Sequence, residues 1–188
     1  MGEQQKQSWN TRLFLRVINI VGKSALLDTF MIFAARWLIH IFLAAIIVWL
    51  FFSRDEQMLY FIFTIGSGIV ASLVLNWTIA LFMRKPRPIV HFPKIKQIVQ
   101  PHQTFKSFPS DHSTIAFTFA LIVILIGVTP FWEVLLLTIA SIVAISRVYV
   151  GVHYPRDILG GLLMAILISH ISFWLATHVT LPLFLRFF

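Results

Sequence analysis

The chain has 188 residues, of which 59% are hydrophobic and 12% are charged. A soluble domain carries about 25% charged residues. The composition therefore excludes a cytosolic enzyme and indicates an integral membrane protein. The absence of cysteine excludes disulfides, thiol nucleophiles and cysteine-ligated metals. The net charge of +8 favours lipid headgroups and phosphates as partners and argues against nucleic acid.

The first predicted element, over Trp9–Lys23, is an amphipathic helix. Basic and polar residues recur there every three or four positions, and apolar residues occupy the other face. The apolar residues are Trp9, Leu13, Val17, Ile20 and Val21. This pattern is typical of a helix that lies on anionic lipid, and a basic flank before a first membrane span has the same composition. We expect residues 1–26 to form this segment and residues 27–188 to form a membrane-embedded domain.

Five apolar segments follow, at residues 27–52, 57–83, 113–132, 134–150 and 158–185. The three that contain no charge are long enough for a spanning helix, which needs about 20 residues. Gly127, Thr129 and Pro130 predict a tight hairpin between the third and fourth segments. The expected fold class is all-α: a polytopic helix bundle with about five spanning helices plus the N-terminal interfacial helix.

Within the first of these segments, Arg36 and His40 lie one helical turn apart. Such groups inside a membrane span either contact a polar ligand or pair with other polar groups of the bundle. The sequence leaves both interpretations open.

Two polar loops, at residues 84–111 and 147–157, are separated by two spanning segments, so they emerge on the same membrane face. Together they contain nearly all of the unusual polar residues of the chain. Single arginines and histidines at helix ends commonly extend to the membrane interface. A whole set of such groups on one face is costly to bury unless its members bind something charged, so the loops predict one common site.

The residue types in these loops suit phosphoryl transfer. An arginine fork binds phosphate oxygens in a bidentate way and keeps its charge. Ser110 occupies an N-cap position, where backbone N–H groups bind anions. Pro155 fits the first turn of the last helix, with His153 just before it and Asp157 inside it. Asp157 would accept the proton of one ring nitrogen of His153 and leave the other free to attack, while His112 would protonate the leaving oxygen and then activate water.

Two histidines and two aspartates would also suit a divalent metal ion. The sequence contains no HExxH pattern and no acidic cluster, and the nearby arginines repel a cation. We therefore expect no metal and no other cofactor, because arginines can stabilise the charge of the transferring phosphoryl group.

The loops resemble the three motifs of the type 2 phosphatidic acid phosphatase (PAP2) superfamily, in the family order and across residues 76–160. The third motif of the family, SR-x5-H-x3-D, is met in full. The matching positions are Arg87-Pro88, then Pro109-Ser110-Asp111-His112, and then Ser146-Arg147 followed by His153 and Asp157.

This resemblance implies a role for each matching residue. His153 would be the nucleophile that becomes phosphohistidine, and Asp157 would orient it. His112 would be the general acid. The phosphate would be held by Arg87, Arg147 and Ser110.

Two departures from the family pattern affect the phosphate site. The first family motif begins with a lysine seven residues before the Arg of Arg-Pro, and Ala80 stands there in this chain. The candidates to replace its charge are Lys85, Arg84 and Lys106. Asp111 takes the place of the glycine in the second motif, where a carboxylate would keep His112 protonated and would also repel phosphate. We include Asp111 and Lys85 in the predicted phosphate-binding set.

A narrower resemblance concerns the substrate. Phe108–Thr114, Pro101-His102 and Val150–Pro155 are similar to the bacitracin-resistance type of undecaprenyl-diphosphate phosphatase. This similarity implies hydrolysis of undecaprenyl diphosphate to undecaprenyl phosphate and phosphate, which recycles the cell-wall lipid carrier and confers bacitracin tolerance. The expected partners are the isoprenoid diphosphate substrate and anionic membrane lipids, and not nucleic acid.

The charge distribution and the resemblance disagree on sidedness. Five spans place Lys94, Lys96 and Lys106 with the N-terminal helix on the face of the site, against Arg54 and Arg186 on the other face. The positive-inside rule then puts the site in the cytoplasm, whereas the resemblance implies the outer face of the bacterial cytoplasmic membrane. We follow the resemblance, because loops that bind phosphate must be basic for chemical reasons.

Three other functions fit the same residues. The same chemistry would serve on another lipid, such as phosphatidate or phosphatidylglycerol phosphate. A lipid phosphotransferase would pass the phosphoryl group to an acceptor other than water. A non-catalytic membrane scaffold that retained the motifs is the remaining alternative, and the intact His153–Asp157 pair argues against it.

Overall fold

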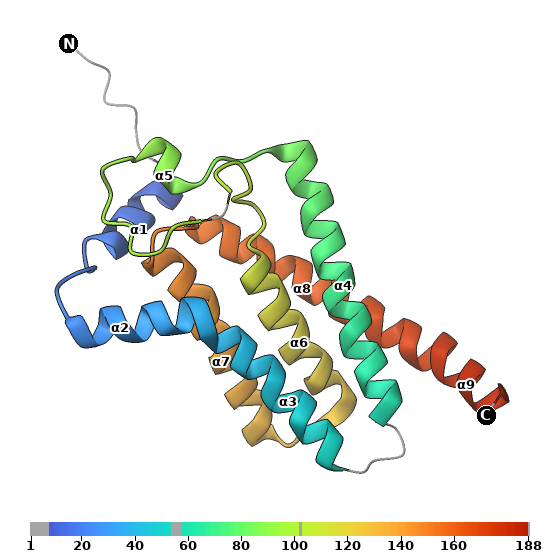
Figure 1. Ribbon diagram of the computed structural model, residues 1–188. Helices are drawn as coiled ribbons and strands as arrows, with labels where there is room; N and C mark the ends of the chain where they lie inside the picture. The colour runs from blue at the N-terminus through green and yellow to red at the C-terminus, as the bar shows by residue number, and fades with distance from the viewer. Residues whose placement is uncertain (1–7, 54–57, 102, 188) are drawn as a thin grey trace.

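The computed structural model describes residues 8–53, 58–101 and 103–187, so the sequence features at Arg54 and His102 lie outside the described residues. Within these ranges all regular structure is helical (Figure 1). The helices are α1 (Trp9–Ile18), α2 (Ala25–Phe33), the π-helical turn η1 (Ala34–Leu38), α3 (Ile39–Ser53), α4 (Met58–Met83), α5 (Pro88–His91), α6 (Asp111–Gly127), α7 (Pro130–Tyr149), α8 (Pro155–Leu175), the π-helical turn η2 (Ala176–Thr180) and α9 (Leu181–Phe187). The predicted all-α fold class is confirmed.

The predicted apolar segments correspond to five helical stretches. Helices α2, η1 and α3 follow one another without a break, and so do α8, η2 and α9. The short link between α6 and α7 falls at the predicted hairpin, where Gly127 has a φ of +106°. Four of the stretches are long and apolar enough to cross a membrane, and α6, with 17 residues, is shorter. This is the architecture of a multi-pass membrane protein.

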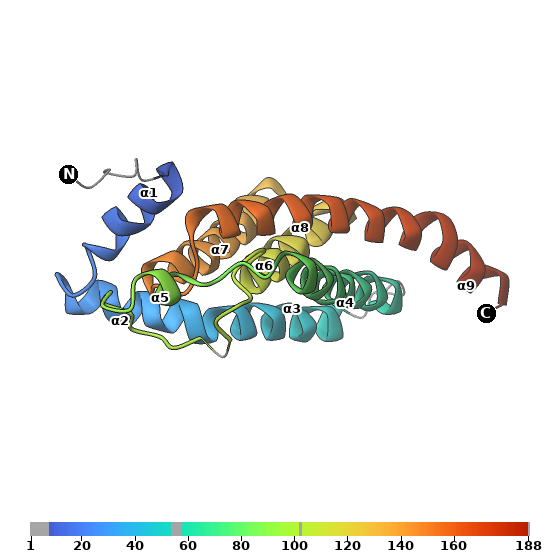
Figure 2. The same ribbon diagram turned by 90° about the horizontal axis from the view of Figure 1, so that it is seen from above.

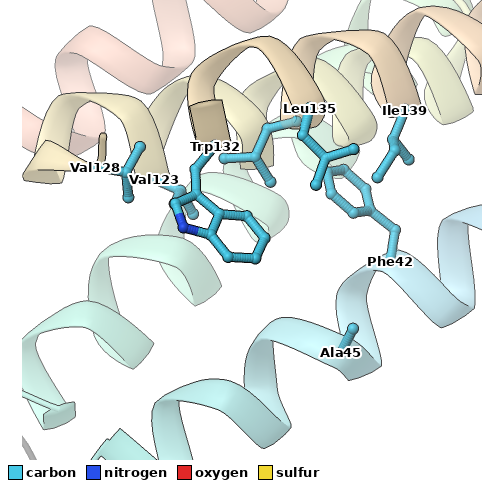
Figure 3. Close-up of a pocket in the computed structure, with 8 residues that line it drawn as sticks. Phe42, Ala45, Val123, Val128, Trp132, Leu135 and Ile139 are labelled. Carbon is cyan, nitrogen blue, oxygen red and sulfur yellow. The ribbon is translucent and has the colours of Figure 1, made fainter. Parts of the chain in front are cut away.

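Helix α6 lies at the centre of the bundle. It packs against α4, α7 and α8, and Figure 2 shows it between α8 on one side and α3 on the other. Phe119 of α6 is 1% exposed. Its ring packs edge-on against that of Phe42 of α3, with the ring centroids 4.9 Å apart. The C-terminal half of α6 borders an apolar cavity of about 300 Å³, which Trp132 of α7 also lines (Figure 3). No charged side chain lines this cavity, so the polar chemistry belongs to the other end of α6.

Helix α1 is amphipathic, as predicted, but a different face of it is buried. Asn10 and Phe14 pack on the protein, and the Phe14 ring centroid lies 5.1 Å from that of Tyr154. Trp9 and Leu13, which the sequence assigned to the apolar face, are 53% and 43% exposed. The helix therefore docks on the bundle through one face and keeps an exposed apolar edge, which suits a membrane interface. Its separation from the rest of the chain as residues 1–26 stays a prediction.

Small residues bring the two polar loops together beside α1 and α5 (Figure 1). Gly161 of α8 faces the start of α6, where an added Cβ would lie 2.9 Å from Ser113 and 3.1 Å from the Ser110 carbonyl oxygen. The Ser110 N–H also donates to the Asp157 carbonyl at 3.1 Å. Gly151, with a φ of +84°, forms the turn after α7 in a conformation that other residues adopt only with strain. The two loops therefore share one end of the bundle, as the sequence predicts.

Candidate active site

A cavity of about 980 Å³ lies where the two polar loops meet, and part of its wall comes from η1 and the start of α3. Five of the predicted site residues line it: Arg87, Asp111, His112, Arg147 and His153. The structure does not place Lys85, Ser110 or Asp157 on its wall. A part for these three residues in binding or catalysis stays a prediction.

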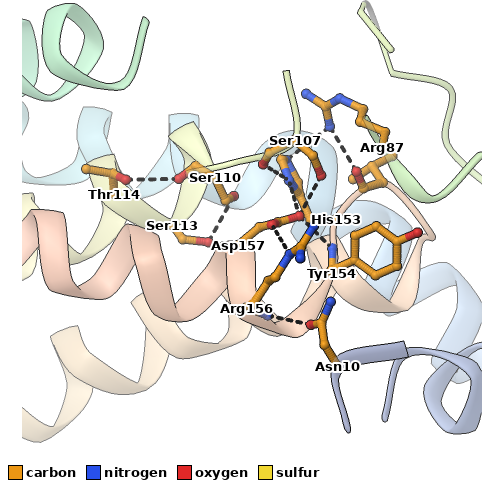
Figure 4. A network of polar contacts seen from close by, with 11 residues as sticks. Asn10, Arg87, Ser107, Ser110, Ser113, Thr114, His153, Tyr154, Arg156 and Asp157 are labelled. Carbon is orange, nitrogen blue, oxygen red and sulfur yellow. Dashed lines mark hydrogen bonds and ion pairs between the residues drawn. The ribbon is translucent and has the colours of Figure 1, made fainter. Parts of the chain in front are cut away.

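His153 lies in the turn between α7 and α8 and is 2% exposed. Its Nδ1 is 2.8 Å from the Ser107 carbonyl oxygen, and its Nε2 is 3.0 Å from Nη1 of Arg87 (Figure 4). A carbonyl oxygen can only accept and a guanidinium can only donate. These partners therefore require the proton on Nδ1 and a lone pair on Nε2, so Nε2 is the ring nitrogen that is chemically able to act as a nucleophile.

Asp157 supports His153 less directly than the sequence predicts. Its Oδ2 is 3.7 Å from Nδ1 of His153, which is too far for a hydrogen bond. The same oxygen accepts from the Ser107 hydroxyl at 2.5 Å and from the Tyr154 N–H at 2.8 Å. The expectation that Asp157 accepts the ring proton is thus corrected: the Ser107 carbonyl accepts it, and Asp157 holds Ser107 in place.

The surroundings of His153 keep its ring neutral. Burial lowers the pKa of His153 to about 4, and the positive charges of Arg87 and Arg147 act in the same direction. The carboxylate of Asp157 opposes this shift without outweighing it. At neutral pH the Nε2 lone pair is therefore present without prior loss of a proton.

Backbone carbonyls hold both arginines in the wall of the cavity. Nη1 of Arg87 donates to the Val152 carbonyl at 3.0 Å, and Nη1 of Arg147 donates to the Ala35 carbonyl at 2.5 Å. The Nε of each arginine is buried and has no hydrogen-bond partner among the described residues. Buried guanidinium donors of this kind favour an anion as their ligand. Because Ala35 belongs to η1, the first membrane helix takes part in positioning Arg147.

His112 and Ser110 stand at the start of α6. His112 lines the same cavity as His153 and Arg147. Ser110 is the N-cap residue, as predicted, but its side chain is fully buried and its Oγ accepts from the Ser113 hydroxyl at 3.0 Å. His112 is thus placed for proton transfer to a group in the cavity, whereas Ser110 joins α6 to the second loop.

Lys106 and Asp111 form an ion pair in the cavity wall. Nζ of Lys106 is 2.5 Å from Oδ2 of Asp111 and 4.3 Å from the centre of the Trp77 ring. Asn76 donates to the other carboxylate oxygen at 3.0 Å. The sequence places a carboxylate, Asp111, where the PAP2 motif has glycine, and this carboxylate was expected to repel phosphate. Because Lys106 neutralises its charge, Asp111 repels a phosphate much less.

The PAP2 motif has a lysine at the position of Ala80, and three basic residues are candidates to replace its charge. The structure distinguishes between them. Lys106 lines the cavity, and Arg84 and Lys85 do not. Lys85 contributes only its backbone carbonyl, which accepts from the Ser107 N–H at 2.9 Å. Lys106 is therefore the residue whose charge reaches the site.

Among the described residues, no group of three or more His, Asp or Glu side chains is arranged to hold a metal ion. The groups that do converge are a neutral histidine whose unprotonated nitrogen accepts from Arg87, a second histidine and several fixed cations. This set is suited to attack on an anionic, electrophilic centre such as phosphorus.

Known proteins share this arrangement of the chain. The sequence model of the PAP2 superfamily matches residues 57–180 of this chain. Undecaprenyl-diphosphatase BcrC of Bacillus subtilis is 30% identical over 167 residues, which cover 87% of this chain and 82% of that protein. YbjG of Escherichia coli is 38% identical over 134 residues, which cover 70% of this chain and 65% of that protein. The crystal structure of LpxE from Aquifex aeolicus has a TM-score of 0.74 at 27% identity and covers 90% of this chain and 97% of that one.

Proposed function

The chain belongs to the PAP2 superfamily, and from that premise we propose that it hydrolyses undecaprenyl diphosphate to undecaprenyl phosphate and phosphate. One observation carries the proposal: two contacts leave the Nε2 lone pair of His153 beside Arg87 in a cavity lined by cations. In this role the protein recycles the lipid carrier of cell-wall synthesis and confers tolerance to bacitracin.

The first half of the reaction breaks the phosphoanhydride bond. Nε2 of His153 attacks the terminal phosphorus in line with the leaving oxygen, so that a P–N bond forms as the P–O bond breaks. Arg87 and Arg147 bind the non-bridging oxygens of this phosphoryl group and stabilise its charge. His112 donates a proton to the leaving oxygen, and undecaprenyl phosphate departs.

The second half releases inorganic phosphate. His112, now neutral, takes a proton from a water molecule whose oxygen attacks the phosphohistidine. The P–N bond breaks, and Nε2 of His153 recovers its lone pair. The Ser107 carbonyl binds the Nδ1 proton throughout, which keeps the imidazole in one tautomer and one orientation.

Two features support a lipid diphosphate as the substrate. The similarity to BcrC extends over most of both chains. Four side chains with a fixed positive charge line the cavity, together with one carboxylate, and this excess matches the greater charge of a diphosphate.

The resemblance to the bacitracin-resistance branch also supports a site on the outer face of the bacterial cytoplasmic membrane. The arginines supply charge stabilisation without a metal ion in this scheme.

The proposal is tested by the release of inorganic phosphate from undecaprenyl diphosphate and from phosphatidate, measured in parallel on detergent-purified protein. We expect a strong preference for the diphosphate, which persists in EDTA and is lost in His153→Ala. His170→Ala, which changes an exposed histidine of α8 outside the cavity, should retain activity.

Each arm of this experiment addresses a different part of the proposal. Equal or better turnover of phosphatidate would contradict the substrate and keep the mechanism. Phosphate release by His153→Ala would contradict the mechanism. Strong inhibition by EDTA at constant pH would contradict the metal-independent scheme.

A further inference from the structure

The cavity contains a second group of basic residues besides those around His153. Arg36 lies in η1, His40 follows in the first turn of α3, and Lys106 comes from the loop before α6. We propose that these three residues form an outer subsite, which binds the lipid-bearing phosphate of a diphosphate substrate. This inference rests on the proposed function, because it requires the terminal phosphate to lie at His153.

Arg36 has no counter-charge among the residues that the structure describes. Asp28, the acid in the same helical stretch, accepts hydrogen bonds from the Tyr149 hydroxyl at 2.6 Å and the Gly22 N–H at 3.1 Å. In the part of the chain that the structure describes, every side-chain ion pair involves Asp111 or Asp157, and none involves Arg36. An intramembrane arginine that lines a polar cavity without a partner is expected to bind a ligand. Of the two interpretations that the sequence leaves open, the structure supports contact with a headgroup.

The π-helical turn connects the outer subsite to the catalytic one. The Ala35 carbonyl in η1 accepts from Arg147, and the next residue is Arg36. One turn later, Nδ1 of His40 lies 3.1 Å from the Arg36 carbonyl oxygen, which can only accept. Short π turns within α-helices frequently mark functional sites, and this one positions cations of both groups.

Lys106 completes the outer subsite from the loop before α6. Its ion pair with Asp111 uses one of the three donors of the ammonium group. The remaining donors are free to bind a phosphate oxygen, and the ring of Trp77 fixes the position of Nζ. Two exposed tryptophans thus flank the outer subsite, since Trp37, 60% exposed, also lies beside His40 with their ring centres 6.4 Å apart.

The tryptophans indicate which phosphate each subsite takes. Tryptophan side chains concentrate at membrane interfaces, so the side of the cavity with Trp37 and Trp77 is the side toward the lipid. The phosphate bonded to the prenyl chain then belongs to the outer subsite, and the terminal phosphate reaches His153. Arg36 and His40 precede the segment that matches the family model, so the outer subsite is a feature in which members of the family can differ.

The test is the ratio of kcat/KM on undecaprenyl diphosphate to kcat/KM on phosphatidate, measured for the wild type, Arg36→Ala and His40→Ala. We expect the ratio to fall about ten-fold in Arg36→Ala, the effect of losing one charge-assisted hydrogen bond, and to recover in part in Arg36→Lys. Inorganic pyrophosphate fills both subsites, so its inhibition constant should rise by a similar factor, and that of inorganic phosphate should rise less. Lys94→Ala, which removes an exposed lysine outside the cavity, is the matched control.

The failure of this inference can be told from the failure of the proposed function. If the wild type prefers the diphosphate while Arg36→Ala leaves the ratio and the pyrophosphate inhibition unchanged, the outer subsite is wrong and the proposed function stands. If the wild type turns over only phosphatidate, the proposed function is wrong, and pyrophosphate inhibition of that turnover still decides whether the outer subsite binds a second phosphate. Arg36→Gln, which keeps most of the side-chain volume, replaces Arg36→Ala if the alanine variant does not fold.

Discussion

Burial of His153 as a neutral ring makes the stability of the protein depend on pH. The pKa of His153 is about 4 in the folded protein, whereas an unfolded histidine has a pKa of about 6.5. Between these values the unfolded chain binds one more proton than the folded chain, so the free energy of unfolding falls as the pH falls. We expect the free energy of unfolding to fall by at most roughly 3 kcal/mol over this window, and the thermal midpoint to decrease with it.

The variant His153→Asn isolates this contribution, because asparagine does not take up a proton in the same range. Its thermal midpoint in detergent should change less between about pH 6.5 and about pH 4 than that of the wild type. His178→Asn, at an exposed histidine of η2, should follow the wild-type curve. Parallel curves for all three proteins would show that His153 is not held neutral.

Ser107 is expected to be a positioning residue. Its hydroxyl donates to Asp157, while its carbonyl accepts the Nδ1 proton of His153. Ser107→Ala keeps the carbonyl but loses the bond that fixes it, and hydrogen bonds to charged groups contribute about 1.5–3 kcal/mol. We expect kcat to fall about ten-fold or more while KM changes by less than about two-fold.

The measurement is steady-state kinetics on undecaprenyl diphosphate, with Ser67→Ala as the control. Ser67 lies in α4, where its hydroxyl donates to the Thr64 carbonyl and has no link to the site. A rise in KM at constant kcat would place Ser107 in substrate binding instead. Ser107→Thr, which keeps a hydroxyl, should recover part of the loss.

Residue types and motif spacing were sufficient to find the groups that line the cavity around His153. His112, His153 and the two arginines stand at helix ends where the sequence places them. The partner of the Nδ1 proton was missed, because it is a backbone carbonyl and such a group leaves no signal in side-chain identity. The structure does not place Lys85 on the cavity wall, and its predicted part in phosphate binding stays a prediction.

At the scale of helices, close packing of α8 on the start of α6 depends on Gly161. A Cβ there would meet the Cβ of Ser113 at 2.9 Å and the Ser110 carbonyl at 3.1 Å. Gly161→Ala must therefore push α8 away from the loop that contains Ser110 and His112. Overpacking of this kind costs about 1–3 kcal/mol, and we expect a lower thermal midpoint together with a lower kcat.

Gly66→Ala is the matched control, because it lies inside α4 and an added Cβ meets no atom within 4 Å. Alanine favours a helix interior over glycine by about 1 kcal/mol, so this variant should be as stable as the wild type or more stable. If Gly161→Ala behaves like Gly66→Ala, the contact between α8 and α6 is not tight enough to position the site.

The helices themselves were well predicted, because long uncharged runs and Pro or Gly at their ends are strong local signals. The buried face of α1 was not. Its hydrophobic periodicity allows two apolar faces, and the choice between them depends on Tyr154 and Phe92, which pack on Phe14 from distant parts of the chain. The same limit applies to η1, whose role becomes visible only when the Ala35 carbonyl meets Arg147.

At the scale of the whole molecule, topology leaves one question, which is the side of the membrane that the site faces. The polar loops and α1 share one end of the bundle, and the α6–α7 hairpin lies at the other end of α6 (Figure 1). Lys106, one of the basic residues on this face, lines the cavity and pairs with Asp111, so its charge serves the site and is a poor topology signal for the positive-inside rule. We therefore propose that the end with the polar loops faces outward.

The chain has no cysteine, so a single introduced cysteine reports its own position. Lys94→Cys marks the end with the polar loops, and Thr129→Cys marks the α6–α7 hairpin, and both positions are exposed. In bacterial spheroplasts, a membrane-impermeant maleimide should label Lys94→Cys directly, and should label Thr129→Cys only after the membrane is permeabilised. The reverse pattern would put the site in the cytoplasm, where a carrier diphosphate released on the outer face could not reach it, and the proposed substrate would have to change. Retained phosphatase activity in both variants is the control that the labelled protein is folded.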